Sequence, residues 1–273
     1  MKLSHKLLKI FLVLSFSLAY PCTTKVSEWT MLNFSPAFYE LIYFTNKKLD
    51  KHIIQEHEEI KQSIKDVNLN FSVIDINQLK NENEKIMFEM AGKEKMPFYA
   101  LYYKNQLFTQ FESAGELLSL LQSPLLAKIT DELKGGKLCT LLFLKNGDQK
   151  QNDQSADIIK RYLSTSILKD IIPVISLNPD NLQHKMFIKI LLNVESDLTH
   201  IKEPMLFGIF GRFRILEPLV GKGITAENIN YLVQFLSADC SCIIKTQMPG
   251  IDMLYFNKWK DVKPALLNNI IKE

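Results

Sequence analysis

The feature that most constrains the fold of this chain is an order of elements that occurs twice along its 273 residues. A proline is followed by a run of aromatic and β-branched residues, a tight turn, a second such run and a helical pattern. In the first half these are Pro97, residues 98–103, Lys104 and Asn105, residues 107–111 and residues 115–122. Strands joined by so short a turn pair antiparallel, so we expect a hairpin followed by a helix.

The second half repeats this order. Its elements are Pro204, residues 205–210, a turn at Gly211 and Arg212, a returning strand over residues 214–220, and a helix that follows Gly221, Lys222 and Gly223 and runs through Ser237. Thr225 is a residue type that caps helices, and Glu227 suits the positive end of the helix dipole. Two halves that end in the same hairpin and helix predict two domains of one kind.

The elements upstream of the first hairpin complete a β-α-β-α-β-β-α order. Residues 37–45 and 71–76 are strand-like, and apolar spacing predicts helices over residues 49–67 and 82–92. This order, with a proline before the third strand, resembles the thioredoxin fold, in which that proline follows a cis peptide bond. The resemblance implies cis bonds at Pro97 and Pro204.

A helix over residues 124–133, stopped by Gly135 and Gly136, places the expected domain boundary. A strand over residues 138–144, a polar loop to Gln154 and a helix over 156–169 follow. Residues 171–177 and 186–192 are both strand-like, and the pattern does not decide which is the central partner. We predict an α/β protein of two tandem thioredoxin-like domains, residues 20–123 and 124–273, each a mixed central sheet flanked by helices.

The C-terminal third carries a more specific pattern. Glu-Pro-Met-Leu-Phe-Gly-Ile-Phe-Gly-Arg from Glu203 is followed by Gly-Lys-Gly at Gly221, by Cys-Ser-Cys at Cys240, by Pro-Gly-Ile-Asp at Pro249, and by Trp259. This pattern resembles an uncharacterised family of exported bacterial tandem thioredoxin-like proteins. The resemblance implies architecture and export, not a reaction. Phe213 departs from the family pattern, which has glycine there.

The first 19 residues are typical of a cleaved signal peptide. Lys2, Lys6 and Lys9 precede an apolar run over residues 10–19 that is too short to span a bilayer. We therefore expect an exported protein, periplasmic or associated with the cell envelope, and no transmembrane segment in the mature chain. Cys22, just after the expected cleavage point, is an alternative site for a lipid anchor, although Pro21 stands where a small residue is wanted.

The charge balance argues against nucleic acid as a partner. The chain has 33 basic and 30 acidic residues, and the expected signal peptide holds three lysines and no acid, so the mature protein is formally neutral. No run of Lys or Arg supplies the basic face that nucleic-acid binding requires. The partner that we expect is a protein of the cell envelope.

Neither domain has the Cys-x-x-Cys pair of a catalytic thioredoxin. That pair stands at the start of the first helix, where a lowered thiol pKa favours the attacking thiolate. The corresponding positions here are Thr45 to Lys48 and Lys145 to Asp148. Ordinary thioredoxin chemistry is therefore excluded at these positions, and we do not expect an enzyme.

Cys240 and Cys242 are the remaining candidates for chemistry. On a strand over residues 240–245 they would share one face. They could be structural thiols, a strained and easily reduced disulfide pair, or two ligands of copper or zinc that need a third from elsewhere. Cys139 lies in an apolar strand and is interpreted as a buried structural thiol. No cofactor is predicted outright; copper or zinc belongs to the metal alternative.

Arg212, Arg214 and Lys222 lie close in sequence, beside a glycine-rich turn and the start of a helix. They are candidates for binding an anion, and the alternative is a tight turn with solvated charges. The function that these observations favour is an exported, non-catalytic binding or scaffolding protein. The alternative function is thiol–disulfide exchange or copper or zinc handling through Cys240 and Cys242.

Overall fold

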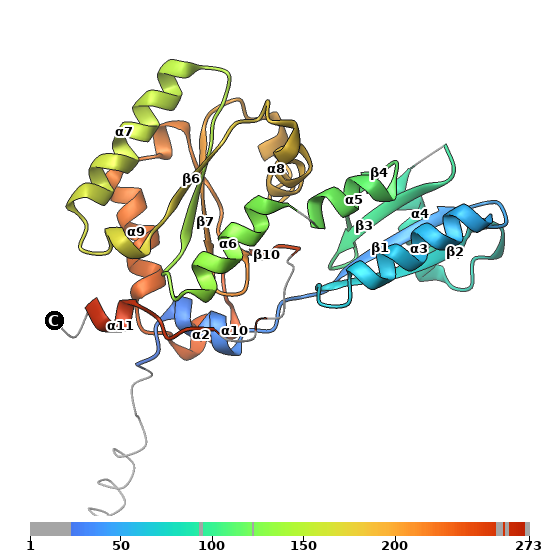
Figure 1. Cartoon of the computed structure of the whole chain (residues 1–273), viewed down its shortest axis with the longest axis horizontal. Coiled ribbons are helices and arrows are strands. Elements are labelled where there is room, and N and C mark those ends of the chain that lie inside the picture. The colour runs from blue at the N-terminus through green and yellow to red at the C-terminus, as the bar shows by residue number, and fades with distance from the viewer. Residues whose placement is uncertain (1–22, 93–94, 122, 255–258, 260–261, 271–273) are drawn as a thin grey trace, which may run out of the picture.

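The computed structural model of the chain describes residues 23–92, 95–121, 123–254, 259 and 262–270, and within them two α/β domains. Figure 1 shows the first domain at the right and the second at the left. In the described residues, no helix is both long and apolar enough to cross a membrane. The predicted signal peptide and Cys22 lie outside the described residues.

The first domain is a four-stranded sheet with helices on both faces. Its elements are β1 (Tyr39–Thr45), α3 (Lys51–Ser63), β2 (Leu69–Asp75), η1 (Ile76–Gln78), α4 (Glu82–Ala91), β3 (Phe98–Tyr103), β4 (Gln106–Phe111) and α5 (Ala114–Leu121). The strand order is β2-β1-β3-β4, with β2 parallel to β1 and the β3–β4 hairpin antiparallel to its neighbours. This is the β-α-β-α-β-β-α order expected from the sequence.

Local chemistry explains several of these boundaries. The Asp50 and Asn81 side chains cap α3 and α4 by accepting from the Ile53 and Glu84 amides. Alternation along β1 sends Leu41 and Tyr43 toward the core cluster that includes α3 and α5, and Ile42 and Phe44 toward α4. The β3–β4 turn has positive φ at both Lys104 and Asn105, as a two-residue hairpin of type I′ requires.

The second domain repeats the plan with a longer chain. Its elements are α6 (Pro124–Lys134), β5 (Thr140–Leu144), α7 (Gln149–Thr165), η2 (Lys169–Ile171), β6 (Val174–Leu177), η3 (Leu182–His184), α8 (Lys185–Leu192), η4 (Leu198–His200), β7 (Met205–Phe210), β8 (Arg214–Ile215), β9 (Leu219–Val220), η5 (Gly221–Gly223) and α9 (Ala226–Ser237). With β10 (Ile251–Asp252) from the C-terminal part of the chain, the sheet order is β10-β8-β7-β5-β6, and β9 also pairs with β7. Strand β5 is parallel to β6 and antiparallel to β7.

The chain ends add further elements. These are α2 (Val26–Asn33), α10 (Cys242–Thr246), β10 (Ile251–Asp252) and α11 (Leu267–Ile270). Although α2 precedes the first domain in sequence, it lies against the second domain (Figure 1). The Val26 amide donates to the Ala238 carbonyl at 3.0 Å, and the Cys240 amide donates to the Thr24 carbonyl at 2.9 Å. Residues 23–33 therefore pack with the second domain, across the expected boundary.

Three expected elements of the second domain are wrong. Residues 186–192 belong to α8, so β6 is the parallel partner of β5. The expected strand over residues 240–245 is mostly helix α10, whose first turn is capped by the Ser241 hydroxyl accepting from the Ile244 amide. The returning strand is divided into β8 and β9 around Pro218, a residue without the N–H that a continuous ladder needs.

A common apolar core joins the two domains. One cluster of buried side chains includes Leu117 and Leu120 of α5 in the first domain and Phe187 and Leu191 of α8 in the second. At its edge the Lys189 ammonium donates to the Gln110 carbonyl at 2.9 Å. The opposite face of the second sheet packs against α7 and α9 in a separate cluster.

Candidate functional site

The first domain has a polar turn where a catalytic thioredoxin has its dithiol. This turn follows β1 and precedes α3. The Thr45 hydroxyl accepts from the Lys47 amide at 3.1 Å, and the Asn77 side chain donates to the Asn46 carbonyl at 3.0 Å. The polar groups of this turn are thus used in hydrogen bonds with the turn itself and with Asn77, and the turn contains no thiol.

The second domain has an equally polar turn after β5. The Asn152 carboxamide accepts from the Asn146 amide at 3.0 Å and donates to the Asn146 carbonyl at 2.8 Å. The Asp148 carboxylate accepts from the Gln151 amide at 3.1 Å, which starts α7 earlier than the sequence pattern predicts. The residues of this turn stabilise the helix start and supply no nucleophilic thiol.

The two prolines before the hairpins differ from each other. The Met96–Pro97 peptide bond is cis, as expected from the resemblance. Among the described residues it is the only cis bond, so the expectation for Pro204 is wrong. The Pro204 carbonyl instead accepts from the Gly221 amide at 2.8 Å. Pro204 thus connects the start of β7 to the glycine turn that follows β9.

A hollow of about 520 Å³ lies beside Pro204 and is called the Pro204 hollow below. Three segments line it: helix α7 with Gln154 and Arg161, the pair Glu203 and Pro204, and residues 221–225. They meet at the carboxyl end of β5, because Leu144 pairs with Met205 and Met205 also pairs with Val220. Crevices at the carboxyl ends of strands are where open α/β sheets bind ligands.

The lining of the Pro204 hollow carries both signs of charge. Arg161 and Lys222 are basic, Asp157 and Glu203 are acidic, and all four are exposed. Gly221 has a φ of 47°, and a Cβ atom there would meet the Glu203 carboxylate at 2.2 Å. Only glycine fits this turn without displacing Glu203. The hollow is therefore lined by charges of both signs and suits a ligand that presents both charges.

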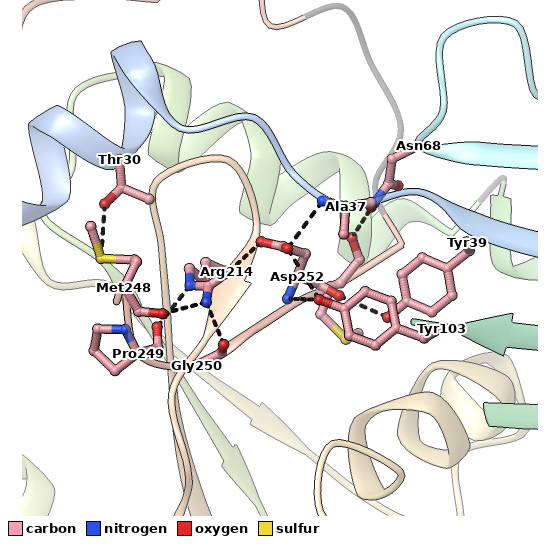
Figure 2. Close-up of polar contacts among 11 residues, drawn as sticks. Thr30, Ala37, Tyr39, Asn68, Tyr103, Arg214, Met248, Pro249, Gly250 and Asp252 are labelled. Carbon is pink, nitrogen blue, oxygen red and sulfur yellow. Dashed lines mark hydrogen bonds and ion pairs between the residues drawn. The ribbon is translucent and has the colours of Figure 1, made fainter. Parts of the chain in front are cut away.

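The second candidate site is a buried polar junction between the domains, shown in Figure 2. The Arg214 guanidinium on β8 pairs with the Asp252 carboxylate on β10, with 2.6 Å between Nη1 and Oδ1. Arg214 also donates to the carbonyls of Met248, Pro249 and Gly250. Both charged side chains are almost fully buried. A buried ion pair is stabilising only when further hydrogen bonds satisfy it, and these do.

The first domain completes this junction. The Asp252 Oδ2 atom accepts from the Tyr103 hydroxyl and from the Ala37 amide, both at 3.1 Å. The Tyr39 hydroxyl donates to the Asp252 carbonyl at 2.7 Å, and Asn68 donates to the Met253 carbonyl at 3.1 Å. Burial, followed by the Asp252 charge, raises the pKa of Tyr103 to about 12. Both tyrosines therefore remain protonated donors at neutral pH.

Backbone conformation around this junction is unusual at two positions. Gly250 has a φ of 89°, and a Cβ atom there would meet the Ile215 carbonyl oxygen at 2.2 Å. Phe213 has a φ of 65° and is fully buried, and its carbonyl accepts from the Met253 amide at 3.0 Å. Phe213 therefore occupies a left-handed position that glycine adopts freely and that is costly for phenylalanine. Burial of the Phe213 ring offsets that cost.

The three anion-binding candidates are not brought together. Arg212 donates to the Met31 and Leu32 carbonyls at 2.7 and 3.0 Å, at the end of α2. Arg214 is used by the buried junction, and Lys222 lines the Pro204 hollow. The two guanidinium groups hold the protein together, which leaves Lys222 as the candidate with an exposed charge.

The cysteines have different surroundings. Cys240 is buried and packs in the α7–α9 cluster, whereas Cys242 is exposed at the start of α10 and carries a free thiol. A disulfide therefore does not close the Cys240–Ser241–Cys242 ring. Burial raises the pKa of Cys139 to about 12. Within the described part of the chain, no group of three or more His, Cys, Asp or Glu side chains is arranged to hold a metal ion.

No family model matches this sequence, and a search of curated proteins gave no match. Among solved structures, 22 chains match. The zinc-bound form of human ERp44 is 12% identical with a TM-score of 0.26, and the match covers 78% of this chain and 57% of that chain.

The first two thioredoxin domains of Saccharomyces cerevisiae Eps1p are 14% identical with a TM-score of 0.27, covering 72% of this chain and 92% of theirs. Those of Naumovozyma dairenensis Eps1p are 13% identical with a TM-score of 0.25, covering 81% and 98%. The strand order and pairing of the two sheets define this chain as a protein of two tandem thioredoxin-like domains.

The junction residues were missed as a site in the sequence. Asp252 is part of the Pro-Gly-Ile-Asp pattern, but nothing local shows that its carboxylate faces Arg214 and Tyr103. The separations are 38 residues from Arg214 and 149 from Tyr103. A lone acid in an otherwise apolar C-terminal strand was the only available signal.

Proposed function

We propose that this chain is an exported binding protein that holds a segment of a partner protein in the Pro204 hollow, without thiol–disulfide exchange. The observation that carries the proposal is the hollow itself. Three segments from different parts of the second domain converge at the carboxyl end of β5, beside a turn that lacks cysteine. Export rests on the signal-peptide pattern of residues 1–19, and the mixed charges of the hollow suit a polar polypeptide segment.

The buried junction supports this function by fixing the domains relative to each other. Ordering two domains before binding lowers the entropy lost when a partner binds. The two domains are held in a fixed arrangement by hydrogen bonds between the C-terminal strand and both sheets. These bonds are made by Arg214, Asp252, Tyr39 and Tyr103. A scaffold with a fixed geometry would present the Pro204 hollow in one orientation.

Site-specific photo-crosslinking tests the proposal in the cells that produce the protein. A photoreactive residue replaces Gln154, which lines the hollow, and in a matched variant it replaces Glu89, which is exposed on α4 of the first domain. We expect a discrete protein adduct at position 154 and none at 89. Reversing Arg161 and Lys222 to glutamate should remove the adduct, whereas Cys240→Ser with Cys242→Ser should leave it unchanged. Equal adducts at both positions would contradict the proposal.

Export is tested separately by the intact mass of the protein recovered from the envelope fraction. Cleavage after residue 19 leaves Tyr20 as the first residue. A diacylated or triacylated mass beginning at Cys22 would instead show the lipid-anchored alternative. An uncleaved protein in the cytoplasm would contradict export.

A further inference from the structure

Strand β6 forms one edge of the second sheet, because β5 is its only partner among the described strands. The Leu141 amide donates to the Pro173 carbonyl, and the Lys145 amide donates to the Leu177 carbonyl, both at 2.9 Å. Backbone groups of alternate residues point to opposite sides of a strand, so residues 173, 175 and 177 face β5. The amide and carbonyl groups of Val174 and Ser176 therefore face away from the sheet, where they can pair with another strand.

A hollow of about 560 Å³ lies along this edge and is called the β6 hollow. Val174 and Ser176 both line it, together with the apolar side chains of Phe143, Ile159 and Leu163 from β5 and α7. Val174 is 37% exposed. Recognition by strand addition needs these two features side by side: an open edge for main-chain hydrogen bonds and a pocket for alternate side chains.

The rim of the β6 hollow indicates the charge of its ligand. Lys160 and Lys169 line it with a single acid, Asp170, so the rim has a net charge of one positive unit. In the part of the chain that the structure describes, neither lysine forms an ion pair within 4.0 Å. An acidic side chain on the bound segment would be complementary to this rim.

We propose that β6 and the β6 hollow take an extended segment of a partner protein as an added strand. The segment places an apolar side chain in the hollow and an acidic side chain near Lys160 and Lys169. This surface is distinct from the Pro204 hollow, because α7 presents Gln154 and Arg161 to one hollow and Ile159 and Leu163 to the other. The proposal does not depend on the function proposed for the Pro204 hollow.

The test uses the chain from residue 20 and two fluorescent decapeptides of alternating valine and threonine, one ending in two glutamates and the other in two lysines. Fluorescence anisotropy measures binding. We expect saturable binding of the acidic peptide at least tenfold tighter than of the basic peptide. Hydrogen exchange at the Val174 and Ser176 amides should slow when the acidic peptide is bound, because these groups gain hydrogen bonds.

Two variants decide the outcome. Ser176→Pro removes an edge amide that the fold does not use, and should weaken acidic-peptide binding roughly 3- to 10-fold for one lost hydrogen bond. The double change Lys160→Glu and Lys169→Glu should reverse the preference between the peptides. The proposal is overturned if both variants bind the two peptides as the unmodified protein does, or if neither peptide binds saturably. Sedimentation equilibrium tests the other occupant. If the unmodified protein is a dimer and Ser176→Pro makes it a monomer, a second copy of this chain occupies the β6 edge, and the proposal is overturned.

Discussion

Arg214 and Asp252 stand directly opposite each other on β8 and β10, and their side chains form a buried ion pair 2.6 Å long. The pair joins the C-terminal strand to the second sheet, and the other oxygen of Asp252 accepts from Tyr103 of the first domain. One carboxylate thus links two domains and the C-terminal extension. Because both charged side chains are almost fully buried, loss of either charge leaves the other without solvent to compensate it.

Asp252→Ala should therefore lower the free energy of unfolding by roughly 3–5 kcal/mol, the usual cost of leaving a buried charge without its partner. Urea unfolding followed by circular dichroism measures this. Glu58→Ala is the matched control, because it removes the exposed Lys61–Glu58 pair and should cost at most about 1 kcal/mol. The double variant Arg214→Met with Asp252→Leu should be more stable than Asp252→Ala. A loss below about 1 kcal/mol for Asp252→Ala would contradict this account of the junction.

Tyr103→Phe should lower the free energy of unfolding by roughly 1.5–3 kcal/mol, the range for a hydrogen bond to a charged group. Its hydroxyl donates to the Asp252 carboxylate at 3.1 Å and accepts from the Asp252 amide at 3.3 Å. Tyr43→Phe is the control: Tyr43 is also buried in the first sheet, but its hydroxyl makes no hydrogen bond to any described residue. If both variants lose the same free energy of unfolding, the hydrogen bonds of the Tyr103 hydroxyl do not contribute to stability.

Much of the fold could be predicted because its signals are local. The short apolar and aromatic runs of β1, β3 and β7, each preceded by a proline, and the capping residue Thr225 identify elements without reference to the rest of the chain. The same reasoning fails for residues 186–192, whose apolar run has no proline just before it and fits a buried helix as well as a strand. Pattern reasoning cannot separate the two when nearly every position is apolar.

The candidate site could be predicted only in part. The absence of thiols from the turns after β1 and β5 is visible in the sequence, and so is the proline that lines the Pro204 hollow. The role of Asp252 depends on contacts with residues far away in the chain. Closeness in sequence grouped Arg214 with Arg212 and Lys222 as candidates for binding an anion, and the structure separates the three. A short separation in sequence is a poor guide to where a long, charged side chain reaches on a hairpin.

His57 predicts a pH dependence of stability in the first domain. Its ring is 3% exposed, packs 4.6 Å from the Tyr43 ring and 5.0 Å from the Phe71 ring, and leaves Nε2 without a hydrogen-bond partner. Burial lowers the pKa of His57 below 6.5. The unfolded chain therefore binds the proton more tightly, and this contribution to stability is present above pH 6.5 and is lost as the pH falls below it.

We expect His57→Phe to lose less stability than the unmodified protein between pH 7.5 and pH 5.0, measured as free energies of unfolding in urea. Carboxylates titrate in both proteins, so the difference between them isolates His57. His52→Gln, a change at an exposed position of the same helix, should follow the unmodified protein. If His57→Phe and the unmodified protein lose equal stability, His57 does not carry the effect.

The thiols provide the test that separates binding from redox or metal chemistry. In a Cys22→Ser variant, we expect one thiol to react rapidly with a disulfide reagent in the native state and three after denaturation. The fast thiol is Cys242, which is exposed, whereas Cys240 is buried and the pKa of Cys139, raised to about 12, keeps that group protonated. Cys242→Ser should abolish the fast reaction, and Cys139→Ser should leave it unchanged.

If the denatured, unreduced protein shows one thiol and reduction restores three, Cys240 and Cys242 form a redox pair. If one equivalent of Cu(I) protects Cys242 from the reagent in the native state, and a Cys240→Ser variant loses this protection, the two thiols bind metal. Either result would replace a binding-only role with the alternative function.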